Sequence, residues 1–555
     1  MASSATGSNR WLYGPARDLL FGCGLLYVAF FALSTVAGGA IRLSQPTVLL
    51  PLLIVLSSTP HYGATLIRVY EQRRDRQAYA YYAGWITMAL LLLFVTGVYD
   101  DLVASCMFTL YLTWSPWHYT GQNFGVGVMM LRRAGVEIAP DTRRWVHATF
   151  VLSYALTFVA MHDGSGAVTD SMVGYAGEGV RFLSLGIPNA LCTAAISLLG
   201  VAHLGCTVGA AVRLLRVATA RDLVPIGALW LTQAVWFAIP LSIRGLGLTT
   251  PVEPLSSELR SHYFLWIAVG HAVQYLWVTS YFARASSGER GLGVWYGKAL
   301  LAGNAAWAVP VLLFAPDGIG RLSYDGGLAL TVAAFVNLHH FVLDGAIWKL
   351  RSKRVADVLI RTTADGLDAD AAGSGARGAL GRKLVWSATA LMMMLSAAEF
   401  WERLIHRPSA AARGAWDTVS ASLDRTAWIG RDNAAMRVRL GDAYARSGDH
   451  AAAGDQYLRS IALRSNSQAL DGIGQLLLSE RRFDEALRYF EAALEESPDS
   501  PGIMAHAAKA LIEKGEIERG RAMLARARSL EEDAADSGTD GDETPRASLD
   551  RRATD

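Results

Sequence analysis

Apolar stretches of about twenty residues recur along the first 400 positions of this chain. Each is long enough to cross the hydrocarbon core of a bilayer as an α-helix. Only 18% of the 555 residues are charged, whereas globular proteins average about 25%. The sequence therefore predicts an all-α protein that begins with a polytopic transmembrane helical bundle, and it excludes an ordinary soluble enzyme. We count about eleven spans, at roughly 18–39, 47–69, 78–98, 102–131, 145–162, 187–211, 222–243, 260–283, 298–315, 327–348 and 383–401.

The charges of the connecting loops predict the topology of these spans. Arginines follow the even-numbered spans, as at Arg73 and Arg132, whereas acids such as Asp100 and Asp163 follow odd-numbered ones. Because Lys and Arg are retained on the cytoplasmic side, we expect a cytoplasmic N-terminus and even-numbered helices that run inward. With eleven spans, everything after residue 401 would lie outside the cytoplasm. We expect a multi-pass protein of a bacterial inner membrane, with the lipid bilayer as its first partner.

The C-terminal part repeats itself at a period of 33 to 34 residues. This pattern resembles the tetratricopeptide repeat, which implies an α-solenoid that binds a peptide or protein, here an unknown one. Small residues would let paired helices approach closely, and large ones would fill the space between pairs. The matching positions are Gly441, Tyr444, Ala453 and Tyr457, then Gly474, Leu477, Ala486, Phe490, Ala493 and Pro498, and finally Ala508, Leu511, Gly520, Leu524 and Ala527.

These patterns together predict five segments. The last is rich in Asp, Glu, Ser, Thr and Gly without helical periodicity, so we expect it to be disordered. The segments are an N-terminal cytoplasmic segment at 1–17, a polytopic membrane domain at 18–401, a connector helix region at 402–432, the repeats at 433–530 and a disordered tail at 531–555.

Four of the predicted even-numbered spans carry a histidine at similar depth: His61, His118, His271 and His340. Between 10 and 14 residues separate them from the basic residue at the inner end of the span, here counting from His339 on the tenth span. At about 1.5 Å per residue, this spread is only about 6 Å of depth. Ionisable side chains inside a bilayer are costly and mark functional sites, and neutral imidazole is the commonest metal ligand. The four histidines therefore predict one metal site, although hydrogen bonding between helices remains an alternative.

Polar residues close to these histidines predict the surroundings of the site. Asn337, His340 and Asp344 follow one helix face, so we expect His340 to point inward and His339 to be the alternate. Asp344 would be a fifth ligand or an outer-shell partner. Iron is the expected metal, with haem as the alternative. A hydrophobic small molecule or lipid would be the substrate, in a cavity lined by Tyr119, Gln122, Gln274 and Tyr275.

Two short segments carry a family resemblance. The tripeptide PHY at 60–62 and the hexapeptide WHYTGQ at 117–122 resemble the histidine segments of the Brp/Blh-type membrane carotenoid dioxygenases, over about residues 50–350. The resemblance implies an iron-dependent oxygenase that acts on an isoprenoid. The chain departs from the family at Tyr62, where a glycine is expected, and in lacking an HxxxH pair near His271.

Two other classes of function fit the gross architecture. One is a lipid-linked glycosyltransferase with extracytoplasmic repeats, whose acids would have to be Asp100 and Asp101. The other is a non-enzymatic membrane scaffold or receptor that uses its repeats to recruit partners. The formal net charge of +2 provides no basic field, so we expect no nucleic-acid partner.

Overall fold

The computed structural model describes residues 10–37, 49–71, 73–164, 179–241, 260–286, 291–316, 318–349, 353–361 and 376–537. Within these ranges the fold is all-α, as predicted, and one isolated β-bridge joins Asp163 to Ile187. The chain divides into two compact units. The first comprises Met1–Pro408 and Thr426–Arg431, and the second comprises Ser409–Arg425 and Asp432–Asp555.

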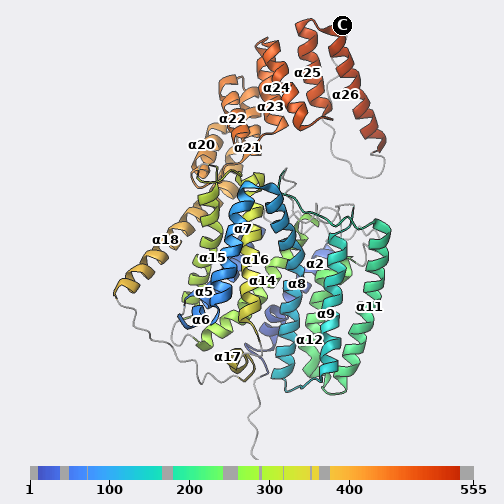
Figure 1. Cartoon of the computed structure of the whole chain (residues 1–555), viewed down its shortest axis with the longest axis vertical. Coiled ribbons are helices and arrows are strands. Elements are labelled where there is room, and N and C mark those ends of the chain that lie inside the picture. Colours follow the sequence, from blue (N-terminus) through green and yellow to red (C-terminus); the bar gives the residue numbers. More distant parts are fainter. Residues whose placement is uncertain are drawn as a thin grey trace, which may run out of the picture. The chain divides into compact units, whose positions relative to one another are not determined.

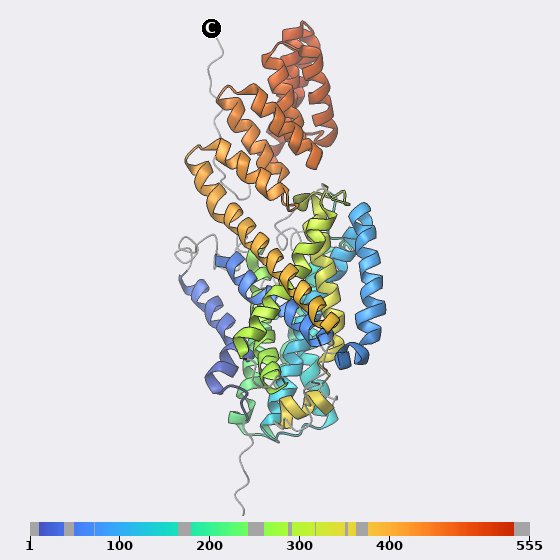
Figure 2. The same cartoon turned by 90° about the vertical axis from the view of Figure 1, so that its left-hand side faces the viewer.

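The first unit is a helical bundle. Many of its helices run side by side, and α18 follows the outside of the bundle, where it packs on α15 (Figures 1 and 2). Short π-helical turns extend several helices, and the two used below are η2 (Ile54–Ser58), before α5, and η5 (Tyr324–Leu328), before α16. The main helices are α2 (Leu25–Ala37), α5 (Thr59–Tyr70), α7 (Thr87–Tyr99), α8 (Asp101–Arg133), α9 (Pro140–Met161), α11 (Asn189–Leu215), α12 (Ala220–Gln233), α14 (Arg260–Ser286), α15 (Leu292–Phe314), α16 (Ala329–Ile347) and α18 (Ala376–Trp401).

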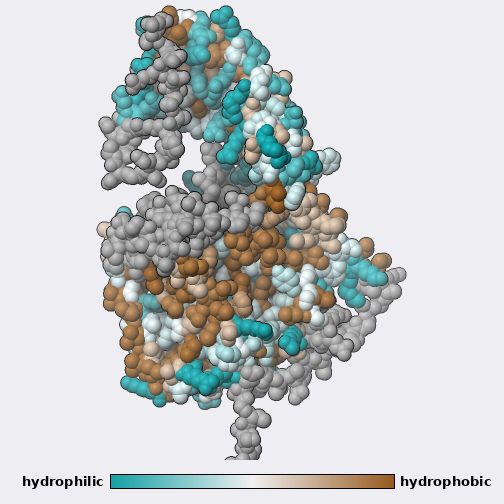
Figure 3. Space-filling view, turned by 180° about the vertical axis from the view of Figure 1, so that it is seen from behind, coloured by the Kyte–Doolittle hydropathy of each residue, from teal (hydrophilic) through white to brown (hydrophobic). Residues whose placement is uncertain are grey.

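Seven helices in the described ranges are long and apolar enough to cross a membrane, and the bent pair Pro15–Gly22 and Leu25–Leu33 would be an eighth. Their outer faces expose large apolar side chains: Leu198 and Val201 on α11 are 71% and 73% exposed. Figure 3 shows such side chains spread over the flank of the first unit. Because exposed apolar surface of this extent is unfavourable in water, these faces suit a lipid environment.

The described helices thus support only some of the eleven expected spans. The span expected at 383–401 lies in the apolar helix Leu380–Ala412, but α8, α9 and α14 do not meet the criterion of apolarity. These three helices bury polar side chains such as Asn123, Thr149 and Gln274, which lower their apolar content. That they also cross the bilayer stays a prediction.

Two glycines hold α5 against α15. A Cβ at Gly63 would lie 1.7 Å from the carbonyl oxygen of Ala299, and one at Gly303 would lie 1.8 Å from that of Thr59. The two backbones are therefore in direct contact, which only residues without a side chain permit. Because Gly63 follows His61 by two residues, about 200° around the helix, this packing turns His61 to the opposite side.

Different residues connect neighbouring segments of the chain at the two ends of the bundle. At one end Arg133, the last residue of α8, donates to the carbonyl oxygens of Trp11 and Leu359 at 2.9 Å each. At the other end Ser105, near the start of α8, accepts from the backbone N–H of Arg181, and the guanidinium of Arg431 lies 3.9 Å from the ring centre of Tyr324.

The second unit consists of stacked helix pairs. The ring of Tyr457 packs against Gly441 and Gly472, where an added Cβ would come within 2.6 Å and 2.5 Å of it. Phe490 packs in the same way on Gly474, so the predicted small and aromatic positions meet as expected. The helix pairs are α21 (Ala434–Arg446) with α22 (His450–Leu463), α23 (Ser467–Ser479) with α24 (Phe483–Glu496), and α25 (Pro501–Lys514) with α26 (Ile517–Ser537).

The boundaries of the repeats differ in detail from the expected ones. Before the first pair, α20 (Trp416–Ala427) contributes Val419 and Leu423 to a core with Leu440, so this part of the predicted connector packs on the repeats. At the other end, α26 continues through Ser537, so the first seven residues of the predicted tail are helical. Helical continuation of a charged segment does not need the apolar periodicity on which the prediction relied. Residues 538–555 lie outside the described ranges.

Candidate metal centre

Four helices of the first unit each contribute one histidine to a single cluster. His61 comes from α5, His118 from α8, His271 from α14 and His340 from α16. One ring nitrogen from each lies within 4.8 Å of the other three. The residues are separated by up to 279 positions in the sequence, so the fold brings together the four that their similar depth had indicated.

The separation of these nitrogens is close to what a single ion requires. Two nitrogens bound to one ion at about 2.1 Å can be at most about 4.2 Å apart. The observed limit of 4.8 Å exceeds this by a few tenths of an ångström. Small rotations of the imidazole rings would therefore suffice to place all four nitrogens on one ion.

Most ring nitrogens of the cluster have no hydrogen-bond partner. Both nitrogens of His61 and His271, and Nε2 of His118 and His340, are buried without one among the described residues. The four rings pack edge to face, with centroids 4.2 Å apart for His61 and His340 and 5.0 Å apart for His61 and His271. Leaving a polar atom buried and unpaired costs about 1–3 kcal/mol, so six of them in one place need an explanation. A metal ion would accept a lone pair from one nitrogen of each ring at once.

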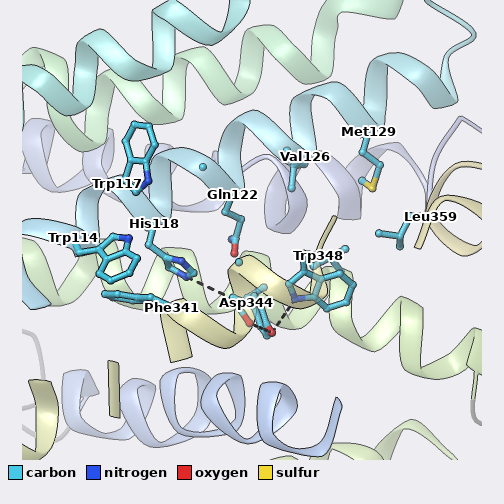
Figure 4. A pocket seen from close by; sticks show the side chains of 15 residues that line it. Trp114, Trp117, His118, Gln122, Val126, Met129, Phe341, Asp344, Trp348 and Leu359 are labelled. Atoms are coloured by element: carbon cyan, nitrogen blue, oxygen red, sulfur yellow. Dashed lines mark hydrogen bonds and ion pairs between the residues drawn. The ribbon is translucent and has the colours of Figure 1, made fainter. Parts of the chain in front are cut away.

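Asp344 lies beside the cluster, and hydrogen bonds to one of its carboxylate oxygens fix its orientation. Its Oδ1 accepts hydrogen bonds from Thr65 at 2.9 Å and from Tyr275 at 2.7 Å. Its Oδ2 lies 3.3 Å from His340 Nε2 and 3.8 Å from His118 Nε2 (Figure 4). One oxygen is thus fixed by hydroxyl groups, and the other faces the same point as the histidine nitrogens.

Further contacts orient the rings and the carboxylate. Thr65 Oγ1 lies 3.0 Å from His340 Nδ1, which leaves Nε2 of that ring for the cluster. Trp348 donates its indole N–H to the hydroxyl oxygen of Tyr275 at 3.0 Å. Partners of this kind select the tautomer of a ligating histidine and fix its direction.

The local sequence places His61 and His118 after prolines. Pro60 lies in the first turn of α5, just after the π-helical turn η2, and the hydroxyl of Ser57 donates to the carbonyl oxygen of Leu53. Pro116 lies inside α8, which remains a single helix. A proline has no N–H to donate, so the preceding carbonyls find other partners, and π-helical turns are frequent at functional sites.

The remaining predicted site residues divide into two groups. Gln122 and Tyr275 line a cavity beside the cluster, whereas Tyr119 packs on His271 and Gln274 lies in a buried amide network. His339 points away: its Nε2 lies 3.0 Å from Thr87 and 3.3 Å from Tyr70. On an α-helix, consecutive residues differ by about 100°, so His339 and His340 cannot both face the cluster.

Two cavities flank the cluster. One, of about 360 Å³, is bounded by His118, Asp344 and Tyr275 at the cluster and mainly by aromatic and aliphatic side chains and glycines elsewhere (Figure 4). The other, of about 340 Å³, is bounded by His339, His340, Tyr62 and Thr65 and is otherwise apolar. Both volumes lie within the range of small-molecule sites.

Sequence reasoning missed several residues of this region, among them Trp348 and the cavity glycines Gly121 and Gly125. The spacing of the two glycines, three and seven residues after His118, was a usable signal because it places them near the same helix face. Trp348 lies at the end of its helix, where no periodicity indicates its contact with Tyr275.

The comparisons with known proteins concern the second half of the chain. Tetratricopeptide-repeat family models match residues 406–469 and 477–536, so the C-terminal region carries these repeats, as predicted. A search of curated proteins finds no match to the chain. Nothing in these comparisons supports the resemblance of residues 50–350 to the carotenoid dioxygenases.

Proposed function

We propose that the first unit is a membrane metalloprotein in which His61, His118, His271 and His340 hold one metal ion. The observation that carries the proposal is the group of six buried imidazole nitrogens that have no hydrogen-bond partner among the described residues. One ring nitrogen from each of the four histidines lies within 4.8 Å of the other three. Histidines that only linked helices would instead be paired with neighbouring polar groups, as His203 is with the carbonyl oxygen of Thr149.

Iron is the metal that the proposal favours. Sites with several imidazoles, one carboxylate and open positions suit nonhaem iron, and Asp344 Oδ2 is placed to be the carboxylate ligand. Bound iron would supply the activation of O2. A haem is disfavoured, because four imidazole nitrogens this close together would occupy the positions that the porphyrin needs.

The chain's own residues would perform the supporting tasks. Thr65 fixes the tautomer of His340, and Tyr275 with Trp348 holds Asp344 in place. Phe341 stacks on His118 with ring centroids 4.5 Å apart and lines the larger cavity beside it. Such packing excludes water from the reacting groups.

The substrate in this proposal is a lipid or isoprenoid that enters from the bilayer. Apolar cavities next to the cluster and lipid-facing helices on its outside support this class of substrate. The protein would then be an iron-dependent oxygenase of an inner membrane.

The repeats indicate interaction with another protein, which would bring a partner to the membrane enzyme. If the first unit held no metal, a scaffold or receptor would be the remaining function. The glycosyltransferase alternative has less support, since Asp100 caps α8 by accepting from the backbone N–H of Val103 at 2.9 Å. Asp101 keeps one buried oxygen without a hydrogen-bond partner among the described residues, so it remains that alternative's best residue.

A comparison of membrane lipids tests the proposal. Cells that express the wild type, His61→Ala or His203→Ala would be extracted and analysed by mass spectrometry. We expect an oxygenated or cleaved lipid with the wild type and with His203→Ala, which alters a histidine outside the cluster, and none with His61→Ala. Identical lipid profiles in all three strains, each with the protein present in its membrane, would contradict an oxygenase.

A further inference from the structure

The larger cavity beside the cluster is elongated. Its lining includes Trp114 and Met129, both on α8, and the cluster residue His118 lies between them. At about 1.5 Å per residue, the fifteen positions from Trp114 to Met129 correspond to about 22 Å along the helix. Figure 4 shows Trp114, Trp117 and Phe341 at one end, Gln122 and Asp344 in the middle, and Met129 with Leu359 at the other end. This shape suits a chain-like molecule that lies along α8.

Glycines keep this cavity wide. Gly121 and Gly125 on α8 and Gly345 on α16 line it, and a Cβ added to any of them would meet nothing within 4 Å. Glycines spaced by four on a membrane helix usually permit close helix packing, but these face empty space. Gly121 is exposed and Trp117 is 39% exposed, so the cavity reaches the outer face of the first unit. A ligand could therefore enter it directly from the bilayer.

The hydrogen bonds of Gln122 fix which of its atoms remains free. Its Nε2 donates to the backbone carbonyl of His271 at 3.3 Å and to Gln274 Oε1 at 2.5 Å. The orientation of Gln274 is itself fixed, because its Nε2 donates to the backbone carbonyl of Gly22 at 2.7 Å. A backbone carbonyl can only accept, so neither amide can be reversed.

The free atom of Gln122 is thus a hydrogen-bond acceptor. No described residue donates to its Oε1, and the side chain points toward Asp344 across the cavity (Figure 4). A ligand that fills the cavity and displaces water from this oxygen has to offer a donor, because a carbonyl oxygen left unpaired in an apolar cavity is unfavourable. A carboxylate or phosphate head group would offer only acceptors at neutral pH and would lie near the Asp344 carboxyl group. A hydroxyl group meets the requirement.

We infer that this cavity binds a long-chain lipid alcohol, whose hydroxyl donates to Gln122 Oε1 and whose chain lies along the glycine face of α8. The inference names the substrate class of the proposed oxygenase and rests on that proposal for the role of substrate. Binding itself does not need the metal. The hydroxyl-bearing end would be held next to His118 and Asp344, within reach of the cluster.

Photocrosslinking tests the inference on the full chain in lipid nanodiscs. The probe is hexadecanol with a diazirine on its chain, and hexadecanol, its methyl ether and hexadecanoic acid are the competitors. Peptide mass spectrometry should locate the label on residues that line the cavity, such as Met129 and Leu359. Hexadecanol should compete about tenfold better than the ether or the acid, the effect of one hydrogen bond to an acceptor that the bound ligand covers.

Matched variants separate binding in the cavity from contact with bulk lipid. Gly125→Leu fills the cavity and should abolish this label, whereas Gly205→Leu should retain it, because Gly205 is an exposed glycine of α11 whose Cβ would also meet open space. Gln122→Met should keep the label and lose the preference for the alcohol over the ether. Equal competition by alcohol and ether in the wild type, or a label spread over α7 and α11, would overturn the inference.

A parallel measurement of metal content distinguishes failure of the binding-site inference from failure of the oxygenase proposal. Cavity labelling of a wild-type protein that never contains metal would support the binding site and refute the oxygenase. A metal-loaded wild type that shows no alcohol-specific label would refute the lipid-alcohol site and leave the metal centre standing.

Discussion

The direct contact between α5 and α15 lies on the side of α5 opposite His61. We therefore predict that a single methyl group added at this contact disturbs the histidine cluster. In Gly63→Ala the new Cβ would lie 1.7 Å from the carbonyl oxygen of Ala299. Carbon and oxygen atoms normally approach to about 3.3 Å, so α5 would have to move by about 1.5 Å. Overpacking of this kind costs about 1–3 kcal/mol of folding free energy.

The same movement would affect the site. The histidine nitrogens already lie up to 4.8 Å apart, a few tenths of an ångström beyond what one ion tolerates. Because His61 lies on the side of α5 opposite this contact, moving α5 away from α15 by about 1.5 Å would push its ring into the other three and disturb the shared position. We therefore expect Gly63→Ala to lower both the unfolding temperature and the metal content.

Thermal unfolding in detergent and metal analysis of the same preparation check this expectation. Gly297→Ala is the matched control, since Gly297 lies on α15, the other helix of this pair, and its Cβ would meet nothing within 4 Å. The control should be unchanged or more stable by about 0.5–1 kcal/mol, because alanine is the better helix former. A Gly63→Ala protein with wild-type unfolding and full metal content would refute the reasoning.

Three further predictions concern other parts of the chain. Reporter fusions after residues 360 and 430 should lie on opposite sides of the membrane, because Leu359 and Arg431 contact opposite ends of the bundle. The same side for both would show that Leu380–Ala412 does not cross. Replacing Asp100 or Asp101 with Asn should affect function in cells less than His61→Ala, and the reverse order would favour the glycosyltransferase. Gly472→Ala should destabilise the repeats through the ring of Tyr457, whereas Gly454→Ala, whose Cβ would meet only Leu476 at 3.8 Å, should not, as measured by hydrogen exchange in α22 and α23.

The sequence predicted the class of fold and the members of the cluster, for a physical reason. Apolar length and the 33–34-residue period are local signals, and the depth of His61 or His118 can be counted along one helix. The sequence also predicted spans in α8, α9 and α14, but these helices bury polar residues such as Asn123 and Gln274 and are not among the helices that are apolar enough to cross a membrane.

Contacts between helices could not be predicted from the sequence. Thr65 meets Tyr275 and Asp344 only because α5, α14 and α16 pack together, and no spacing within one helix encodes this. The empty space next to Gly121 and Gly125 depends on neighbouring helices as well. The direction of Gln122 required knowledge of Gly22, which lies 100 residues earlier in the chain.

The most direct test of the central claim is the metal content of the purified wild type and of single histidine variants, measured together with absorption spectra. We expect near-stoichiometric iron without the absorption bands of haem in the wild type. Metal should fall sharply in His61→Ala, His118→Ala, His271→Ala and His340→Ala, and it should be retained in His203→Ala and His339→Ala, whose rings lie outside the cluster. Asp344→Asn should weaken the affinity by about 10-fold to 100-fold if Asp344 is an outer-shell partner, and by more if it is a ligand. A folded wild-type protein that contains no transition metal would contradict the account.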